Sequence, residues 1–207
     1  MRKILVAVLA GLLLVPMAAV ADNIIYPIGM ASTQGFSNGT FAGPSARGWD
    51  FVIDQPITVV QLGINAGVSI PITMSLWDVT SQTLLGQTTV NSSPFAWEFA
   101  NLGTPINLTP GHTFSVIGWA DTTGQSGWYI YNNTPPPEFN PTGTVTYQDV
   151  RYGNDLGAND FPTGVIGAPA QYGVADIGYT TVPEPMTLAL MGTGLGLVGV
   201  VRRKLNL

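Results

Sequence analysis

Short hydrophobic runs, each interrupted by glycine, proline, asparagine or serine, fill the chain between residues 22 and 181. Apolar and polar residues alternate within these runs, as at Ile72–Leu76 and Phe114–Val116, which is the period of a half-buried strand. No ten residues of this region keep a helical period without a glycine or a proline. The pattern therefore predicts an all-β domain, an antiparallel β-sandwich of jelly-roll-like form. Nine strands are expected, at Gly48–Ile53, Ile57–Asn65, Ile72–Val79, Leu84–Val90, Ala96–Phe99, Thr113–Trp119, Gly127–Tyr131, Gly143–Val150 and Gln171–Tyr179.

Two turns separate predicted strands near the middle of the chain. Thr80–Gln82 is expected to close a hairpin, and Pro110-Gly111 to turn the chain before the next strand. The stretch from residue 75 to residue 118 resembles a sandwich domain of uncharacterised function that occurs in exported bacterial proteins. The residues that carry this resemblance are Trp77-Asp78, Leu84-Leu85, Pro105, Leu108, Gly111 and Phe114. The resemblance implies the fold and no particular activity.

The N-terminus has the layout of a secretory signal peptide. Its elements are a basic start, an uncharged apolar run and small residues at an A-x-A site, namely Arg2 and Lys3, Ile4–Val15, and Ala19 and Ala21. This order predicts export and cleavage after Ala21, so that residues 1–21 are removed by signal peptidase. The alternative is a membrane anchor, which would need roughly 20 apolar residues.

The C-terminus places a proline-rich strip before an apolar segment and a basic tail. Val182, Pro183, Glu184 and Pro185 form the strip, because prolines keep it out of a helix. Residues 186–201 follow with no charge, enough for a helix of about 24 Å that nearly spans a bilayer. The tail, residues 202–207, begins with three cations that stop transfer and stay in the cytoplasm, Arg202, Arg203 and Lys204.

This C-terminal order resembles the PEP-CTERM sorting signal of Gram-negative bacteria. The resemblance covers Val182 to Lys204 and departs from the usual pattern at Met186-Thr187. It implies a precursor anchored in the inner membrane by residues 186–201 and then cut by the membrane protease exosortase. The product would be placed at the cell surface or released, typically in species that make exopolysaccharide and biofilm. A plain tail anchor is the alternative.

The composition of residues 22–181 limits the partners of the predicted domain. This region contains eleven aspartates and glutamates and only two basic residues, Arg47 and Arg151, so its net charge is −9. Nucleic acid is excluded, since its binding depends on lysine and arginine contacts to phosphate. The chain has no cysteine, so a core and not a disulfide must hold this exported domain together.

Candidates for catalysis are few. His112 is the single histidine, so a Ser-His-Asp triad would have to be built on it, and a zinc site would lack a second histidine and cysteine. Asp50, Asp54 and Glu98 are candidates for the two carboxylates of a glycoside hydrolase. The alternative is that these acids are solvated strand ends.

The stretch from residue 152 to residue 164 is a candidate calcium loop. Asn154, Asp155, Asn159 and Asp160 supply the oxygen ligands that calcium prefers. Asparagine, aspartate and glycine are also ordinary turn residues, so a surface loop without a bound ion is the alternative.

An aromatic cluster is the candidate binding site for a sugar. Trp128 and Ile130 face one side of a predicted strand, and Tyr129 and Tyr131 face the other. One side is expected in the core, and the other could stack on a sugar ring with help from nearby amide side chains. Packing of both sides is the alternative.

These observations favour an exported, non-enzymatic protein of the cell surface or extracellular matrix, linked to exopolysaccharide or biofilm. A carbohydrate-binding module is the alternative, and a glycoside hydrolase is a more remote one. No cofactor is expected apart from the candidate calcium ion.

Cleavage of the signal peptide is tested by N-terminal sequencing of the protein recovered from the cell envelope. The expected sequence begins Asp22-Asn23-Ile24, because the A-x-A site ends at Ala21. Recovery of the chain with Met1 intact would contradict the prediction.

Overall fold

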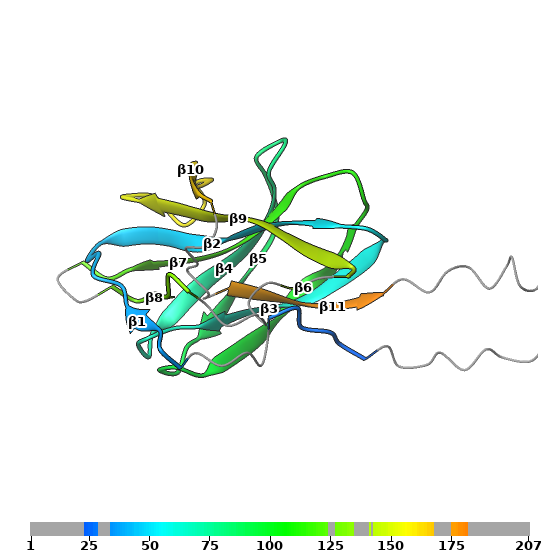
Figure 1. The fold of residues 1–207 in the computed structure, drawn as a ribbon. Helices are drawn as coiled ribbons and strands as arrows, with labels where there is room; N and C mark the ends of the chain where they lie inside the picture. The colour runs from blue at the N-terminus through cyan, green and yellow to red at the C-terminus, as the bar shows by residue number, and fades with distance from the viewer. Residues whose placement is uncertain are drawn as a thin grey trace, which may run out of the picture.

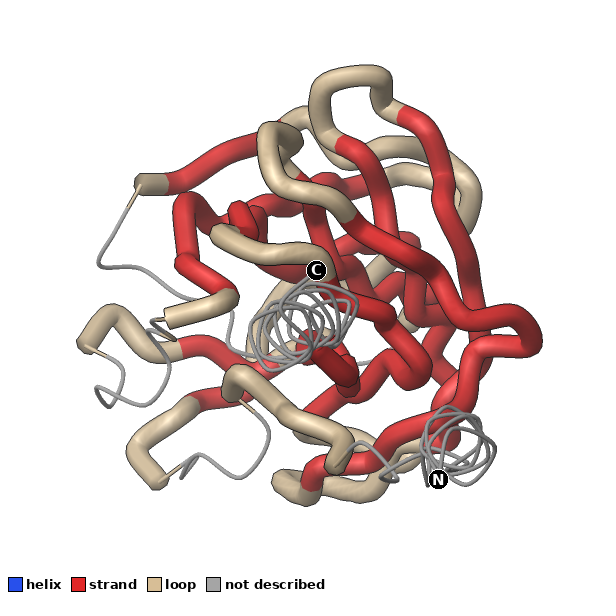
Figure 2. Tube along the Cα trace, turned by 90° about the vertical axis from the view of Figure 1, so that its right-hand side faces the viewer, coloured by secondary structure: helices blue, strands red, loops and turns tan. Residues whose placement is uncertain are grey.

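The computed structural model describes residues 23–28, 34–123, 127–134, 141, 143–167 and 175–181. These residues form strands and loops without a helix (Figure 2). None of the described ranges holds a helix of the length and hydropathy that a membrane crossing needs. The predicted signal peptide, sorting motif, transmembrane segment and basic tail lie outside the described residues.

Two antiparallel sheets pack face to face as the layers of a sandwich (Figure 1). The larger sheet has the strand order β10-β9-β2-β7-β4-β5; its strands are β10 (Gly164–Ile166), β9 (Val145–Asn154), β2 (Pro44–Ile53), β7 (Phe114–Asp121), β4 (Pro71–Asp78) and β5 (Thr83–Asn91). The smaller sheet has the order β11-β3-β6, formed by β11 (Ala175–Thr181), β3 (Ile57–Asn65) and β6 (Trp97–Leu108). A short pair, β1 (Ser37–Asn38) with β8 (Ile130–Tyr131), lies beside them. The antiparallel sandwich is thus as predicted, while the jelly-roll-like description stays a prediction.

The core lies between the two sheets because inward-facing positions of both are apolar. Along β2 the alternation of two places Trp49, Phe51 and Ile53 inside. Strands β3 and β4 each send alternate residues into the same core, and all of those named here are fully buried: Ile57, Val59, Leu62, Ile64, Ile72, Met74 and Leu76. Burial of this many large side chains supplies the main favourable free energy of folding, in a chain without a disulfide.

Strand β6 is much longer than the predicted strand Ala96–Phe99. Gly103 and Pro105 indicate a loop in the sequence, yet the chain stays extended through them to Leu108. The pairing of β3 with β6 shifts register between Val59 and Gln61, and β6 borders the sheet with β3 as its partner. An edge strand with a bulge tolerates a proline, since no ladder hydrogen bond from its nitrogen is required.

The other strand predictions differ from the structure mainly at their ends. Strand β2 begins four residues before the predicted Gly48, at Pro44, and β9 continues four residues past the predicted Val150, to Asn154. Strands β1 and β10 were not predicted, since segments of two or three residues are too short to show an alternation of apolar and polar positions. The predicted hairpin forms, with β4 paired to β5 around Thr80–Gln82.

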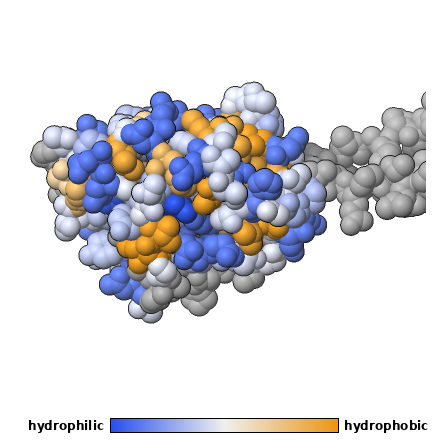
Figure 3. Space-filling view, turned by 90° about the horizontal axis from the view of Figure 1, so that it is seen from above, coloured by the Kyte–Doolittle hydropathy of each residue, from blue (hydrophilic) through white to orange (hydrophobic). Residues whose placement is uncertain are grey.

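A second, smaller hydrophobic cluster lies on the outer face of the larger sheet. Ala46, Trp77 and Ile117 are buried there, although they point away from the main core. The loop between β9 and β10 covers them with Leu156 and Phe161. Viewed from above the orientation of Figure 1, the surface shows hydrophobic residues in separate patches between hydrophilic ones (Figure 3). The larger sheet is therefore packed on both faces around this cluster.

Gly48 allows β2 and β7 to approach closely. A Cβ atom at this position would lie 1.9 Å from the carbonyl oxygen of Val116 and 2.9 Å from the Cα atom of Ile117. Backbone atoms cannot yield as the end of a flexible side chain can, so this glycine is required by the spacing of two central strands.

Replacing Gly48 with alanine should lower the free energy of unfolding by about 3 kcal/mol, because the added methyl overpacks the centre of the sheet. The matched control is Gly103→Ala, where nothing lies within 4 Å of the new Cβ atom. Urea unfolding of both variants measures the difference. Equal midpoints for the two variants would contradict the prediction.

Candidate functional site

The aromatic cluster that the sequence offered as a sugar platform is packed inside the protein. Trp128 is fully buried, and its indole Nε1 donates a hydrogen bond of 2.9 Å to the hydroxyl of Ser45. Tyr129 is 7% exposed and Tyr131 is half-buried. Trp128 and Tyr129 therefore offer no open ring face to a sugar, and the predicted platform of Trp128, Tyr129 and Tyr131 is wrong at the first two of these residues.

Packing from distant parts of the chain explains the burial of Tyr129. The guanidinium of Arg47 lies 4.2 Å from the centre of the tyrosine ring, and a Cβ atom at Gly39 would meet the same ring at 2.2 Å. Arg47 is held in place because it donates hydrogen bonds to the carbonyl of Gly153 at 2.8 Å and to Oδ1 of Asn154 at 2.7 Å. The ring serves as a packing surface for a buried cation.

Three of the four residues of the candidate calcium loop accept hydrogen bonds within the protein. Oδ1 of Asn154 accepts its hydrogen bond from Arg47, a cation, and Oδ1 of Asn159 accepts one of 3.2 Å from Gln87. Asp160 accepts one of 2.8 Å from the backbone of Gly157 within its own turn. Asp155 has a φ of 57° and belongs to the tight turn after β9. No group of three or more histidine, cysteine, aspartate or glutamate side chains is placed to hold a metal ion within the described ranges.

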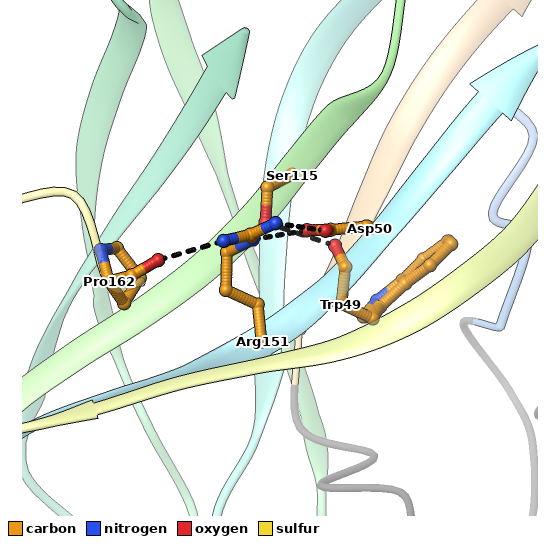
Figure 4. Close-up of polar contacts among 5 residues, drawn as sticks. All are labelled: Trp49, Asp50, Ser115, Arg151 and Pro162. Carbon is orange, nitrogen blue, oxygen red and sulfur yellow. Dashed lines mark hydrogen bonds and ion pairs between the residues drawn. The ribbon is translucent and has the colours of Figure 1, made fainter. Parts of the chain in front are cut away.

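Asp50 forms a buried ion pair with Arg151. The guanidinium Nε donates to Oδ1 of Asp50 at 2.7 Å and Nη2 donates to Oδ2 at 2.5 Å, while Nη1 donates to the carbonyl of Pro162 at 3.0 Å (Figure 4). Phe161 lies over the same guanidinium, with 4.8 Å between its ring centre and the Cζ atom. This fork-shaped contact ties the β9–β10 loop to the larger sheet.

The ion pair removes Asp50 from the candidate glycosidase acids. Both oxygens of its carboxylate are bonded to Arg151, although Asp149 lies opposite Asp50 in the register of β2 and β9. Asp54 is exposed just after β2, and Glu98 lies on β6 in the other sheet. The three predicted acids are therefore not brought together as a catalytic pair.

His112 pairs with Asp78 at the end of the larger sheet. The ring Nδ1 lies 2.7 Å from Oδ2 of Asp78, and the side chain of His112 is 51% exposed. Burial raises the pKa of Asp78, but hydrogen bonds from Ser81 and from His112 outweigh it, so the pKa lies below its ordinary value. Asp78 also accepts a hydrogen bond from the backbone of Ser81 at 3.0 Å. This pair closes the β4–β5 turn against the turn at Gly111, whose φ is 99°.

Two serines that could serve a catalytic triad on His112 are hydrogen-bonded to other groups. Ser81 is bonded to the carboxylate of Asp78, whose Oδ2 contacts His112. Ser115 is fully buried and donates its hydroxyl to the carbonyl of Trp49 at 3.3 Å.

A surface that the sequence did not indicate lies on the outer face of the smaller sheet. The rings of Tyr26 and Phe99 are 4.4 Å apart at their centres, and Trp97 stacks beside Phe99 at 6.0 Å with 22° between the planes. The three side chains are half-buried. Two glycines beneath them, Gly63 and Gly178, leave room for the rings, because a Cβ atom at either would collide with Phe99 or Tyr26.

Amide side chains continue this surface along β3 and β6. The hydroxyl of Tyr26 donates to Oε1 of Gln61 at 2.6 Å, and Nε2 of Gln61 donates to Oδ1 of Asn101 at 2.8 Å. Further along, Thr58 donates to Oδ1 of Asn107 at 2.8 Å. We call these residues the neutral strip: Tyr26, Thr58, Gln61, Trp97, Phe99, Asn101 and Asn107. Their side chains are aromatic, amide or hydroxyl, and none carries a charge.

Replacing Asp50 with asparagine should lower the free energy of unfolding by about 3–5 kcal/mol, because Arg151 would remain buried without its counter-charge. Asp54→Asn is the matched control, since Asp54 is exposed, and should change stability by less than about 0.5 kcal/mol. Chemical unfolding monitored by tryptophan fluorescence measures both. An unchanged Asp50→Asn variant would show that the pair contributes nothing to the fold.

No protein-family model matches the chain, and no curated protein matches it. The candidate site therefore stands on the chemistry and geometry of its own residues.

Proposed function

We propose that the chain is an exported, exosortase-processed, non-enzymatic protein of the cell surface or extracellular matrix, linked to exopolysaccharide or biofilm. The observation that carries the proposal is the order of elements after residue 181: Val182–Pro185, an uncharged segment to Val201, and Arg202–Lys204. Signal peptidase and exosortase are the expected processing enzymes. The membrane is a partner of the precursor through residues 186–201, which anchor it in the inner membrane before release or attachment outside.

The position of the described ends supports processing on both sides of one compact domain. The backbone of Ile25 exchanges hydrogen bonds of 2.8 and 3.0 Å with that of Tyr179. Ile25 lies three residues after the predicted new N-terminus, and β11 ends at Thr181, the residue before Val182. The described residues next to the two predicted recognition sequences are therefore paired with each other at one edge of the sandwich.

The non-enzymatic part of the proposal is supported by the bonding of the candidate catalytic groups. Asp50 is bonded to Arg151, and Asp78 is bonded to both His112 and Ser81. Each contact joins neighbouring elements of the sandwich, as a structural ion pair or turn cap does. The glycoside hydrolase alternative gains no support from this arrangement.

A carbohydrate-binding module is the second candidate function. The neutral strip favours it, since aromatic rings beside amides suit the C–H faces and the hydroxyls of a sugar. It is compatible with the first candidate, because a surface or matrix protein can act by binding exopolysaccharide.

The route is tested by the intact mass and location of the protein in its native cells, with and without residues 182–207. The complete chain should be found outside the inner membrane at a mass that lacks the C-terminal segment. Deletion should give a soluble form that bypasses the membrane stage. Recovery of the complete chain from the inner membrane at a mass that still includes residues 182–207 would contradict the proposal.

Changing both Pro183 and Pro185 to alanine should leave an uncut, membrane-bound precursor. The prolines keep the strip extended, and alanines would let the helix of the membrane segment extend into it. The matched control is the double change of Pro135 and Pro136 to alanine, away from the sorting segment. Immunoblotting of membrane and released fractions measures the ratio of precursor to product. Processing of the Pro183/Pro185 variant at the wild-type rate would favour a simple tail anchor.

A further inference from the structure

We infer that the neutral strip is the binding site for a neutral polysaccharide, with Phe99 and Tyr26 as the stacking surface and Gln61 and Asn101 as the hydrogen-bonding groups. The inference rests on the proposed function in one respect, namely that the protein lies outside the cell, where polysaccharide is present. The site itself is argued from four features of the smaller sheet.

The first feature is the placement of the rings on the outer face of the sheet. Strand β3 sends Leu62 and Ile64 into the core, so Gly63 between them faces outward. Phe99 lies across that glycine: a Cβ atom at Gly63 would be 2.2 Å from two atoms of the ring. Tyr26 reaches over Gly178 in the same way. Neither ring belongs to the two hydrophobic clusters described above, so their burial does not fill the core.

The second feature is the support of the rings. Phe99 is flanked by Tyr26 at 4.4 Å and by Trp97 at 6.0 Å, and Tyr26 is fixed by its hydroxyl to Gln61. Rings that are held before a ligand arrives lose little conformational entropy on binding. Trp97 also packs against the main core and so supports Phe99 from the side. Phe99 and Tyr26 are the two rings that can offer C–H contacts to a sugar.

The third feature is the direction of the hydrogen bonds. The hydroxyl of Tyr26 donates to Gln61, and Gln61 donates in turn to the carbonyl oxygen of Asn101. Bonds in series polarise one another. Asn101 is exposed at the end of the series, and no hydrogen bond from its amide NH₂ group is found among the described residues. A sugar hydroxyl, which both donates and accepts, is a suitable partner for that group.

The fourth feature is charge. The strip contains no aspartate, glutamate, histidine, lysine or arginine. Asp176 lies next to Gly63 in the β3–β11 register, but it is fully buried and accepts backbone hydrogen bonds from Ile28 and Ile177. The net charge of −9 over residues 22–181 repels polyanions. A neutral polysaccharide is therefore favoured over one that carries uronate or sulfate groups.

The length of the neutral strip suits a polysaccharide with several sugar units better than a single sugar. From Thr58 to Gly63 the surface follows β3 for five residue steps, roughly 16 Å at the usual rise of a strand. Asn107 lies beside Thr58 at one end, and Phe99 lies beside Gly63 at the other. Stacking at the aromatic end and hydrogen bonding at the amide end can thus act on successive units of one polymer.

The experiment is affinity electrophoresis of the full chain in a detergent without a sugar head group. The gels contain dextran, a mixed-linkage β-glucan or galactomannan as neutral probes, and alginate as the anionic one. The wild type should be retarded by at least one neutral polysaccharide and not by alginate. Phe99→Leu keeps an apolar side chain over Gly63 but removes the ring face, and should weaken binding roughly tenfold. Asn101→Ala, at an exposed position, should weaken it about threefold.

Phe95→Ala is the matched control, because Phe95 is 47% exposed and is not part of the strip. It should bind as the wild type does. Circular dichroism of every variant confirms that the sheet is retained. Retardation by none of the neutral probes would overturn the inference, as would unchanged binding by both Phe99→Leu and Asn101→Ala, or equal loss in Phe95→Ala. Correct processing of the chain with no glycan binding would overturn this inference and leave the proposed function in place.

Discussion

The buried ion pair between Asp50 and Arg151 determines which surfaces of the sandwich are open. Removing two charges from water costs several kcal/mol per ion, and this cost is offset only where the geometry is close to ideal. Here the carboxylate receives two bonds from one guanidinium, whose remaining nitrogen bonds to Pro162. The pair therefore fixes the β9–β10 loop against the sheet, where Leu156 and Phe161 cover Trp77 and Ile117. On the outer face of the smaller sheet Phe99 is half-buried under Tyr26, and this is the surface that we propose to bind a ligand.

The main strands could be predicted because their sequence period is unambiguous. Strand β3 has the predicted bounds, Ile57–Asn65, since this run is rich in isoleucine, valine and threonine and lies between Pro56 and Gly67. Strand β6 could not be predicted beyond Phe99, because Gly103 and Pro105 are breakers in an isolated segment. Their tolerance depends on an edge position and a shift of register, and both are properties of the assembled sheet.

The candidate sugar platform and the candidate calcium loop show the same limit of a sequence pattern. The sequence left open whether Tyr129 lies on an open face, because a strand pattern shows two sides and does not show what covers each. The cover is Arg47, 82 positions away. The calcium loop was inferred from its asparagines and aspartates, whereas its apolar residues, Leu156 and Phe161, carry the information that it packs on the sheet. An apolar residue in a polar loop is the signal that could have been used.

The neutral strip could not be predicted from the sequence, because its surface depends on glycines that leave room for the rings. Phe99 and Tyr26 are 73 positions apart, and they meet only because Gly63 and Gly178 leave the sheet surface open beneath them. A pattern of side chains cannot reveal a surface that depends on missing side chains. The alternation of Trp97, Phe99 and Asn101 on one face was visible in principle, but it has no meaning until β6 is known to extend past Phe99.

The strip also links binding to the maturation of the chain. Its members come from residue 26 and from strands β3 and β6, and the glycine under Tyr26 belongs to β11, the last described strand. Contacts between residues this far apart in sequence form late in folding, since loop closure has to precede them. An exported chain that folds only after translocation would thus complete the strip once both of its ends had arrived outside. The hydrogen bonds between Ile25 and Tyr179 close the same edge. The surface proposed to bind polysaccharide therefore includes Tyr26 and the strand that adjoin, in the chain, the two sequences proposed to be cut.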